Sequence, residues 1–540
     1  MWRRLIISAV ALAVTSVSAA ERTGAATDTA FYEVRHDRWS AQDEQDYRDF
    51  IAEIGKSDCS TLDACLHGAA NPFAGSDPPG AIFKSDCAEL PYILRFYFAW
   101  KRGLPFSFES DLSARGAARD IRYSRNGNEV IGRFDVPSGM TGMAAIARIR
   151  ATISSASYRL HPDLETPLEP DLYSPAIRLE SIRPGTIVYD PAGHVGVVFD
   201  IDAKGRIHFF DAHTDFSLTE MTYDLRFARM KPSVGAGFKN WRPVYLVGAK
   251  QRADGVFVGG HIEVAANIDI PDFSGEQFFG NGKRLNDSDW KSGTFSLNGD
   301  TLDYYDYVRA RMAGGKLVFE PVTEIRDMAR SLCVDLHYRA QAVTLALAHS
   351  IQNRPEPTRL PENIYGTDGD WEMYSTPSRD ARLKVEFKYL RDTAQRFVEM
   401  AARHNVHLSY DGSDLPGDLL RAYDRETKYC RVTYANSDGS KTTLTYEEAR
   451  QRLFAMSFDP YQCVELRWGD ANAETCGDDP FKRSWYEAEQ PLRNQLERTY
   501  DARMDFTLRD LQERKPGIAD PPDTDVRAYL TKLDQPDSAP

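Results

Sequence analysis

The sequence predicts an α+β protein in which a helix packs on an antiparallel sheet in the N-terminal part and a mainly α-helical part follows. A strong helical pattern begins at Cys87, and three strand-like runs come later, at Thr186–Tyr189, Val195–Ile201 and Arg206–Phe210. From about Val322 the spacing of apolar residues becomes helical. Helices and strands that are segregated along the chain in this way are typical of α+β folds.

Further elements follow from local patterns. The spacing of apolar residues predicts a helix over Asp43–Ile54, and Val244–Val247 reads as another short strand. Residues 430–446 form a predicted hairpin around a polar turn with glycine. Thr445 and Glu448 have the spacing of a capping box, which predicts that another helix begins there.

The first 20 residues have the pattern of a signal peptide. Arg3 and Arg4 form a positive n-region, Leu5–Val17 is an almost unbroken apolar run, and small residues precede Glu21. The apolar run is too short to span a bilayer comfortably, so cleavage is favoured over an uncleaved N-terminal anchor. We therefore expect a secreted or periplasmic protein with no transmembrane segment.

Charge argues against polyanionic partners. The 540 residues carry a formal net charge of −14, and removal of the first 20 residues leaves 64 basic against 80 acidic side chains. No basic stripe stands out along the chain. We therefore expect no nucleic-acid partner and no attraction to an anionic membrane surface.

The chain is long enough for two or three domains. After the signal peptide, residues 30–250 form the predicted α+β domain, and residues 251–320 form a connecting region with a few strands. Residues 321–519 form a mainly helical domain whose role and protein partner are unknown. Residues 520–540 are rich in Pro and Asp, which predicts a disordered tail.

The seven cysteines predict three disulfides and one free thiol, because export places the chain where disulfides persist. Cys59 and Cys65 bracket one short loop, and Cys463 and Cys476 bracket another. By elimination, the third pair is Cys333 with Cys430, which leaves Cys87. Sequence alone does not determine connectivity, so this pairing is a hypothesis.

Cys87 is the candidate nucleophile. Asp86 is a natural N-cap, which would put Cys87 in the first helical position, and Gly103 is a good C-terminal stop. The helix dipole at this position favours thiolate over thiol, and a free backbone N–H could help to hold an oxyanion. The alternative is a buried or disulfide-bonded structural cysteine.

His194 is the candidate base. It follows Gly193 and would start a strand, where the glycine leaves room for an approaching group. An imidazole that reaches the Cys87 thiol can take its proton near neutral pH. The alternative is a surface histidine at a strand edge.

Asp211 is the candidate group that orients His194. Two adjacent antiparallel strands joined by a tight turn would bring Asp211 close to His194. His213 is a second candidate on the same strand face, whereas His208 lies on the opposite face. The alternative role for Asp211 is that of a turn residue at a strand end.

Three segments together resemble the NlpC family of papain-like cell-wall cysteine peptidases: Ser85–Gly103, Arg183–Phe199 and Ile207–Ala212. They share an Asp-Cys at a helix start, a Pro-Gly lead-in to a strand, a His-Val-Gly strand and a polar residue before Ala. The resemblance covers roughly residues 70–215. It implies that residues 30–250 form a papain-like cysteine hydrolase domain with Cys87, His194 and Asp211 as its triad.

The sequence departs from the family pattern at several positions. Cys87 is followed by Ala88-Glu89 where the family has Ser-Gly, Thr186 replaces an aspartate, and Asp211 stands where histidine is more common. Phe73 takes the place of a tyrosine that often assists the oxyanion. The spacer between Cys87 and His194 is also longer than usual.

These observations predict a cysteine endopeptidase or amidase that needs no cofactor and no metal. Its expected substrate is the stem peptide of peptidoglycan, or another peptide, cleaved through a covalent thioester. One alternative is an acyltransferase or transglutaminase-like enzyme that uses the same residues. Another is a non-catalytic scaffold that retains the fold. The pair His404 and His407 lacks further ligands around it, so a metal site there is not favoured.

Overall fold

The computed structural model describes residues 30–118, 120–191, 194–227, 229–364, 369–374, 377–471, 476, 479–497 and 503–534. The predicted signal peptide, residues 1–20, lies outside the described residues. Within the described ranges, no helix has the length and apolar character needed to cross a bilayer.

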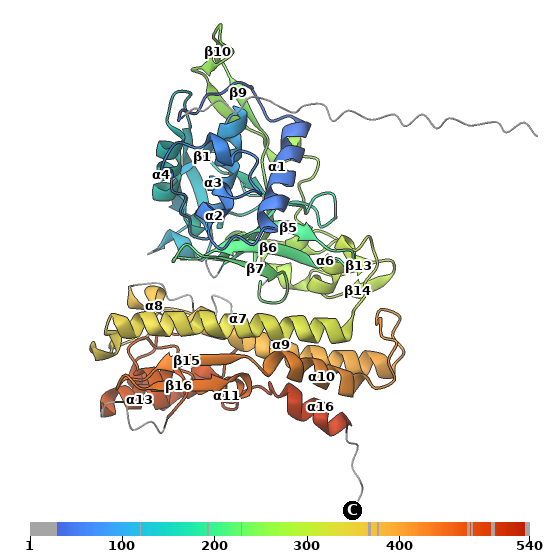
Figure 1. Cartoon of the computed structure of the whole chain (residues 1–540), viewed down its shortest axis with the longest axis vertical. Helices are drawn as coiled ribbons and strands as arrows, with labels where there is room; N and C mark the ends of the chain where they lie inside the picture. Colours follow the sequence, from blue (N-terminus) through green and yellow to red (C-terminus); the bar gives the residue numbers. More distant parts are fainter. Residues whose placement is uncertain are drawn as a thin grey trace, which may run out of the picture.

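The protein has a mixed α+β fold, as predicted, with an N-terminal α+β part stacked on a helical part (Figure 1). A six-stranded antiparallel sheet lies in the N-terminal part, in the order β3-β8-β4-β5-β6-β7. Its strands are β3 (Leu172–Tyr173), β4 (Ile187–Asp190), β5 (His194–Ile201), β6 (Ile207–Ala212), β7 (Leu218–Thr222) and β8 (Gly237–Trp241). The three predicted strands are β4, β5 and β6, each within one or two residues of its expected bounds.

One face of this sheet is covered by helices from the start of the chain. These are α1 (Ala41–Gly55), α2 (Leu62–His67), α3 (Glu89–Arg102) and α4 (Gly142–Thr152), together with the hairpin β1 (Ser107–Ala114) and β2 (Asn128–Asp135). Gly55 at the end of α1 allows close approach to β5, because a Cβ there would lie 2.2 Å from the Cβ of Phe199. Helix α3 is buried almost all round, and Gly103 ends it in the left-handed conformation at φ 64°.

The other face of the sheet is covered by residues 276–312, which lie within the predicted connecting region but form a packed layer. Alternation along β4, β5 and β6 places Val188, Val198 and Phe209 on this face, where they pack with Tyr304 and Tyr307. Both faces of the sheet are apolar, so a second layer has to cover it. That layer contains α5 (Glu276–Phe279), β13 (Phe295–Leu297), β14 (Asp300–Leu302) and α6 (Tyr304–Met312). The strands β9 (Val244–Val247), β10 (Lys250–Gln251), β11 (Phe257–Val258) and β12 (His261–Val264) lie elsewhere, and the backbone N–H groups of Leu246 and Phe257 donate to carbonyl oxygens of the N-terminal segment.

The C-terminal part is mainly helical, as predicted from its spacing. Its longest helices, α7 (Pro321–Ala348) and α9 (Pro377–Ala402), share one apolar core with the hairpin β15 (Arg431–Ala435) and β16 (Lys441–Thr445). The predicted capping box is present, because Thr445 and Glu448 satisfy each other's backbone N–H at the start of α11. The remaining helices are α8 (Asp370–Met373), α10 (Leu415–Thr427), α11 (Tyr446–Arg452), α12 (Val464–Arg467), α13 (Pro480–Ala488), α14 (Gln490–Arg493), α15 (Leu508–Arg514) and α16 (Val526–Asp534).

The prediction of a disordered tail from residue 520 is wrong for the residues that the structure describes there. They form α16, and its Val526 and Leu530 are fully buried in the core of the helical part. Two apolar side chains four residues apart lie on one helix face, which is enough to dock a short helix despite its polar neighbours.

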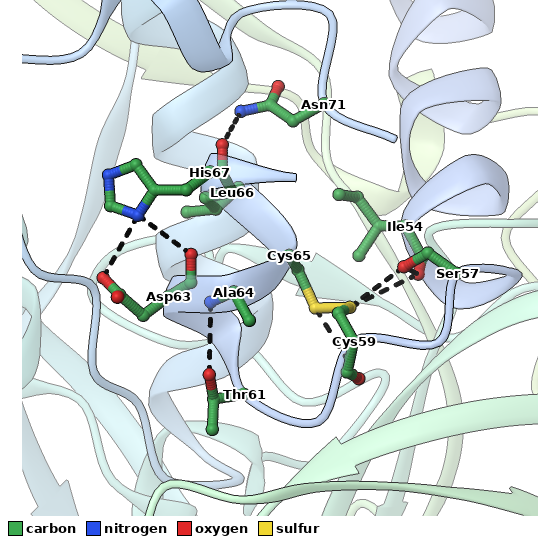
Figure 2. Close-up of a disulfide and its surroundings, with 10 residues drawn as sticks. All are labelled: Ile54, Ser57, Cys59, Thr61, Asp63, Ala64, Cys65, Leu66, His67 and Asn71. Carbon is green, nitrogen blue, oxygen red and sulfur yellow. Dashed lines mark hydrogen bonds and ion pairs between the residues drawn. A yellow bond between two sulfur atoms is a disulfide. The ribbon is translucent and has the colours of Figure 1, made fainter. Parts of the chain in front are cut away.

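The three predicted disulfides are all present. They join Cys59 with Cys65, Cys333 with Cys430, and Cys463 with Cys476. Figure 2 shows the first of them, which joins Cys59 in the loop after α1 to Cys65 in α2. This loop lies against the sheet, because the backbone N–H of Leu218 on β7 donates to the carbonyl oxygen of Ser60.

Candidate active site

Cys87 lies in a capped turn at the start of α3. One carboxylate oxygen of Asp86 accepts the backbone N–H groups of Ala88 and Glu89, each at 2.9 Å. The carboxylate of Glu89 in turn accepts the N–H of Asp86 at 3.1 Å. The regular helix begins at Glu89, two residues later than expected, with Ala88 rather than Asp86 at its N-cap, and the Asp86 carboxylate instead holds the turn that leads into it.

Cys87 is the one cysteine outside a disulfide, and its side chain is half-buried. The backbone N–H groups of Ala88 and Val195 lie near its sulfur and lower the pKa of the thiol. Val195 is the second residue of β5, so the thiol lies at the end of the strand that begins with His194. The hydroxyl of Tyr158 supports this turn by donating to the carbonyl oxygen of Ala88 at 2.6 Å.

The resting thiol is neutral, contrary to the expectation from the helix dipole. Burial raises the pKa of the Cys87 thiol well above its usual range, and the carboxylates of Asp86 and Asp211 raise it further. The two backbone donors oppose this effect but are weaker. A base is therefore needed to remove the thiol proton.

His194 and Asp211 are brought together across β5 and β6. The Nε2 atom of His194 contacts the Oδ2 atom of Asp211, whose side chain is completely buried. Burial alone would raise the pKa of Asp211, but His194, His213 and the Thr219 hydroxyl together outweigh it and lower the pKa to about 2. With Nε2 engaged by the carboxylate, Nδ1 is the nitrogen of His194 that remains to accept a proton.

The other oxygen of Asp211 is held by Thr219, which sequence reasoning missed. The Thr219 hydroxyl donates to Asp211 Oδ1 at 2.6 Å, and the two residues are directly paired between β6 and β7. Since that hydroxyl hydrogen is used, His213 Nε2 donates to Thr219 Oγ1 at 2.9 Å. Only the pairing of β7 with β6 identifies Thr219 as a partner of Asp211, and the sequence analysis did not predict β7.

His213 and His208 do not orient His194. His213 Nε2 lies 3.8 Å from Asp211 Oδ1, on the Thr219 side of the carboxylate. His208 faces Asp202 and Thr222, as its opposite position on the strand predicts. Phe73 packs among Phe50 and other core rings, so it supplies no hydrogen-bond donor to the site.

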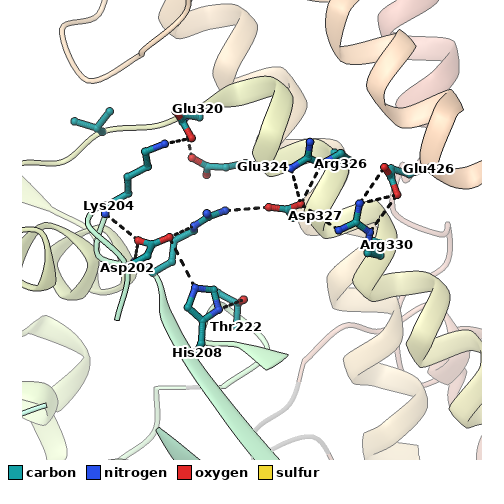
Figure 3. A network of polar contacts seen from close by, with 12 residues as sticks. Asp202, Lys204, His208, Thr222, Glu320, Glu324, Arg326, Asp327, Arg330 and Glu426 are labelled. Carbon is teal, nitrogen blue, oxygen red and sulfur yellow. Dashed lines mark hydrogen bonds and ion pairs between the residues drawn. The ribbon is translucent and has the colours of Figure 1, made fainter. Parts of the chain in front are cut away.

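The helical part covers this site through one face of α7. Asp327 pairs with Arg206 at 3.0 Å, Ser331 accepts from Arg226 at 2.7 Å, and the ring of Tyr338 lies 4.6 Å from that of His213. Figure 3 shows the polar contacts at one end of this junction, between the turn after β5 and α7. Asp335 lies between Ser331 and Tyr338 on the same face and approaches Arg226 to 3.7 Å. We refer to Asp327, Ser331, Asp335 and Tyr338 as the α7 docking face.

Among the residues that the structure describes, two groups of side chains have the composition of metal ligands, but each includes a disulfide. They are Cys333 with His337 and Cys430, and Cys463 with Glu465 and Cys476. Sulfurs that are bonded to each other are not thiolate ligands, so neither group fits a metal ion while its disulfide is intact.

Comparisons with protein-family models, curated proteins and solved structures find no match to this chain. The site must therefore be interpreted from its own geometry and from the motifs described above.

Proposed function

We propose that the protein is an exported cysteine hydrolase that cleaves amide bonds, with Cys87 as nucleophile, His194 as general base and acid, and Asp211 as the residue that orients His194. The contact between His194 Nε2 and the buried carboxylate of Asp211 is the observation that carries this proposal. It holds the imidazole in the tautomer that leaves Nδ1 unprotonated, beside the strand end where the Cys87 thiol lies. A papain-like arrangement of helix and sheet accounts for these positions.

In the proposed reaction, His194 Nδ1 takes the proton from the Cys87 thiol as the sulfur attacks the amide carbonyl carbon. The carbon–nitrogen bond then breaks, and the amine leaves with the proton that His194 returns. A water molecule gives a proton to His194 and attacks the thioester, which releases a carboxylic acid. His194 finally returns that proton to the sulfur of Cys87, so the enzyme is restored.

We propose peptidoglycan stem peptides as the substrate. The predicted export of the chain would place it beside the cell wall, and the motifs around Cys87 and His194 resemble those of the NlpC family. The three disulfides, and the lack of a membrane-spanning helix within the described ranges, are compatible with an extracellular location.

The test combines thiol labelling with digestion of muropeptides. The protein lacking residues 1–20 is treated with iodoacetamide without reductant, and the labelled cysteine is identified by mass spectrometry. We expect labelling of Cys87 alone, a slower rate in His194→Ala, and loss of muropeptide cleavage in both His194→Ala and Cys87→Ala. His208→Ala is the matched control, because it removes a histidine of the same sheet that lies away from Cys87. Equal labelling rates in His194→Ala and the unchanged protein would refute the proposed role of His194.

A further inference from the structure

A cavity lies between α1 and the turn that leads into β4. Its wall is completed by α3, the end of β8 and residues 269–272. It has a volume of about 220 Å³ and is partly open to solvent. A cavity of roughly 150 Å³ in another protein holds benzene, so this one has room for a small organic molecule.

The cavity is separate from the candidate active site. Thr186 lines it just before β4 begins, whereas His194 pairs with Asp190 at the other end of that strand. Four residues of extended chain put Thr186 and Asp190 about 13 Å apart. A ligand in this cavity would therefore leave the surroundings of Cys87 unoccupied.

The Pro-Gly turn before β4 is packed closely against α1. Gly185 has a φ of 91°, and a Cβ at this position would lie 2.8 Å from a ring carbon of Tyr47. Glycine permits both the turn and this close approach. As a result, Arg183 of the turn and Arg48 of α1 line the same cavity, and both side chains are half-buried.

Two of the three carboxylates in the wall are already paired. Both oxygens of Glu44 accept hydrogen bonds from Arg95, at 2.9 and 2.5 Å. Asp272 accepts a hydrogen bond from Arg178 at 2.6 Å. The third, Asp269, is exposed, so water and salt screen its charge.

The two arginines have no acidic partner among the residues that the structure describes. Arg48 Nη1 lies 3.4 Å from Gln45 Oε1, and Arg183 Nη1 donates to the carbonyl oxygen of Glu180 at 3.0 Å. A guanidinium has five N–H donors, so most of those on both side chains are not used within the protein. Burial lowers the pKa of Arg48, and the positive charge of Arg183 lowers it further, as expected for two guanidiniums in one cavity.

The buried polar atoms without a regular hydrogen bond in this wall can all donate. They are Arg48 Nε, Trp241 Nε1 and the hydroxyl of Tyr47. Burial raises the pKa of Tyr47, and its contact with the indole N–H of Trp241 opposes this effect. An indole N–H only donates, so the hydroxyl hydrogen of Tyr47 still lacks an acceptor. Such an excess of buried donors favours a ligand that accepts hydrogen bonds.

We propose that this cavity binds a small organic oxyanion, with its carboxylate or phosphate group between Arg48 and Arg183 and a ring against Trp241. The planar forks of the two guanidiniums match the oxygens of such an anion. Aromatic and proline side chains in the same wall offer apolar surface to the rest of the ligand. The proposed site is independent of the reaction at Cys87.

The first test maps the anion on the protein lacking residues 1–20, without further substitutions. Phenylglyoxal modifies guanidinium groups, and mass spectrometry identifies the modified arginines. At constant ionic strength, we expect phenyl phosphate, benzoate or both to protect Arg48 and Arg183 several-fold, and neutral benzamide to protect neither. The anion that protects more strongly identifies the preferred group. Arg403 is the internal control, because it is exposed just beyond the end of α9 and should be modified equally in every sample.

The second test measures the affinity for the protecting anion by titration calorimetry. Arg48→Gln and Arg183→Gln should each weaken binding about tenfold, as expected for the loss of a charge-assisted hydrogen-bonding group. Tyr47→Phe keeps the ring and should weaken binding less. Asp269→Asn should strengthen it, because a negative charge is removed from the wall, and Arg403→Gln should leave it unchanged.

Thermal unfolding without ligand shows whether each variant is folded, and Arg48→Lys, which keeps the charge without the fork, should bind with intermediate affinity. Equal modification of Arg48 and Arg183 with and without both anions would overturn the proposal, as would unchanged affinity in both glutamine variants. Muropeptide cleavage should persist in Arg48→Gln and be lost in His194→Ala. Failure of the anion site is therefore distinguishable from failure of the proposed hydrolase.

Discussion

The buried carboxylate of Asp211 should make the N-terminal part less stable as the pH falls. Its pKa is lowered from 3.8 to about 2 in the folded protein. Each pKa unit corresponds to about 1.4 kcal/mol, so this group contributes about 2 kcal/mol to the free energy of unfolding at neutral pH. The folded pKa is the lower one, so the contribution is present above pH 3.8 and is lost as the pH falls toward 2. About half of it should remain at pH 3.

Asp211→Asn removes this titration. We expect the variant to be less stable than the unchanged protein by about 2 kcal/mol at pH 6 and by about 1 kcal/mol at pH 3, because the carboxylate that His194, His213 and Thr219 favour in the folded protein is absent at both pH values. The measurement is native-state hydrogen exchange in urea, followed at the amides of β5 and β6, so that the unfolding of this part is read separately from the helical part.

Asp289→Asn is the matched control, because Asp289 is exposed in a 3₁₀ turn and the same chemical change should leave the pH dependence as it is. A difference between the unchanged protein and Asp211→Asn that stays constant from pH 6 to pH 3 would refute the reasoning, since it would mean that His194 does not lower the pKa of Asp211.

Two further predictions concern the thiol and the disulfides. Asp86→Asn keeps a side chain that can hold the turn before α3. It removes a carboxylate that raises the pKa of the Cys87 thiol, an effect second only to burial. The alkylation of Cys87 by iodoacetamide at pH 7 should therefore become several-fold faster. Replacing Cys333 and Cys430 by alanine opens a connection across 97 residues and should lower the free energy of unfolding by about 5 kcal/mol in urea denaturation.

The controls differ for these two predictions. Asp63→Asn removes a carboxylate that pairs with His67 and is not among the groups that shift the pKa of Cys87, so it should not change the labelling rate. A slower reaction in Asp86→Asn would contradict the electrostatic argument. Replacing Cys463 and Cys476 opens a connection across only 13 residues and should cost about 3 kcal/mol. A larger loss for this shorter connection would argue against the loop-entropy explanation.

Local patterns were sufficient to predict much of the fold. The strands that contain His194 and Asp211 are separated along the chain by one short turn. That turn and the alternation of side chains between the two faces of each strand were enough to predict their pairing. The three disulfides followed from loop lengths and elimination. The capping box at Thr445 followed from a four-residue motif.

Features that depend on distant segments were not predicted. Thr219 contacts Asp211 only because β7 pairs with β6, and Leu218–Thr222 is a half-exposed edge strand with weak apolar alternation. Tyr338 comes close to the site from more than 120 residues away, and helical periodicity reveals the buried face of α7 but does not show what its polar face contacts. The neutral state of Cys87 also depends on burial by such distant segments.

The spacing of contacts along α7 limits how its length can change. Asp327, Ser331, Asp335 and Tyr338 recur at intervals of four, four and three residues, while Leu332 and Leu336 face the core of the helical part. One inserted residue after Asp327 would rotate all later residues by about 100° and advance them by about 1.5 Å, so both faces would leave their partners at once. Seven inserted residues would preserve the two faces but carry Tyr338 about 10 Å past His213. Related chains that retain this architecture should therefore vary in length after Ala348 and keep a constant count between Asp327 and Tyr338.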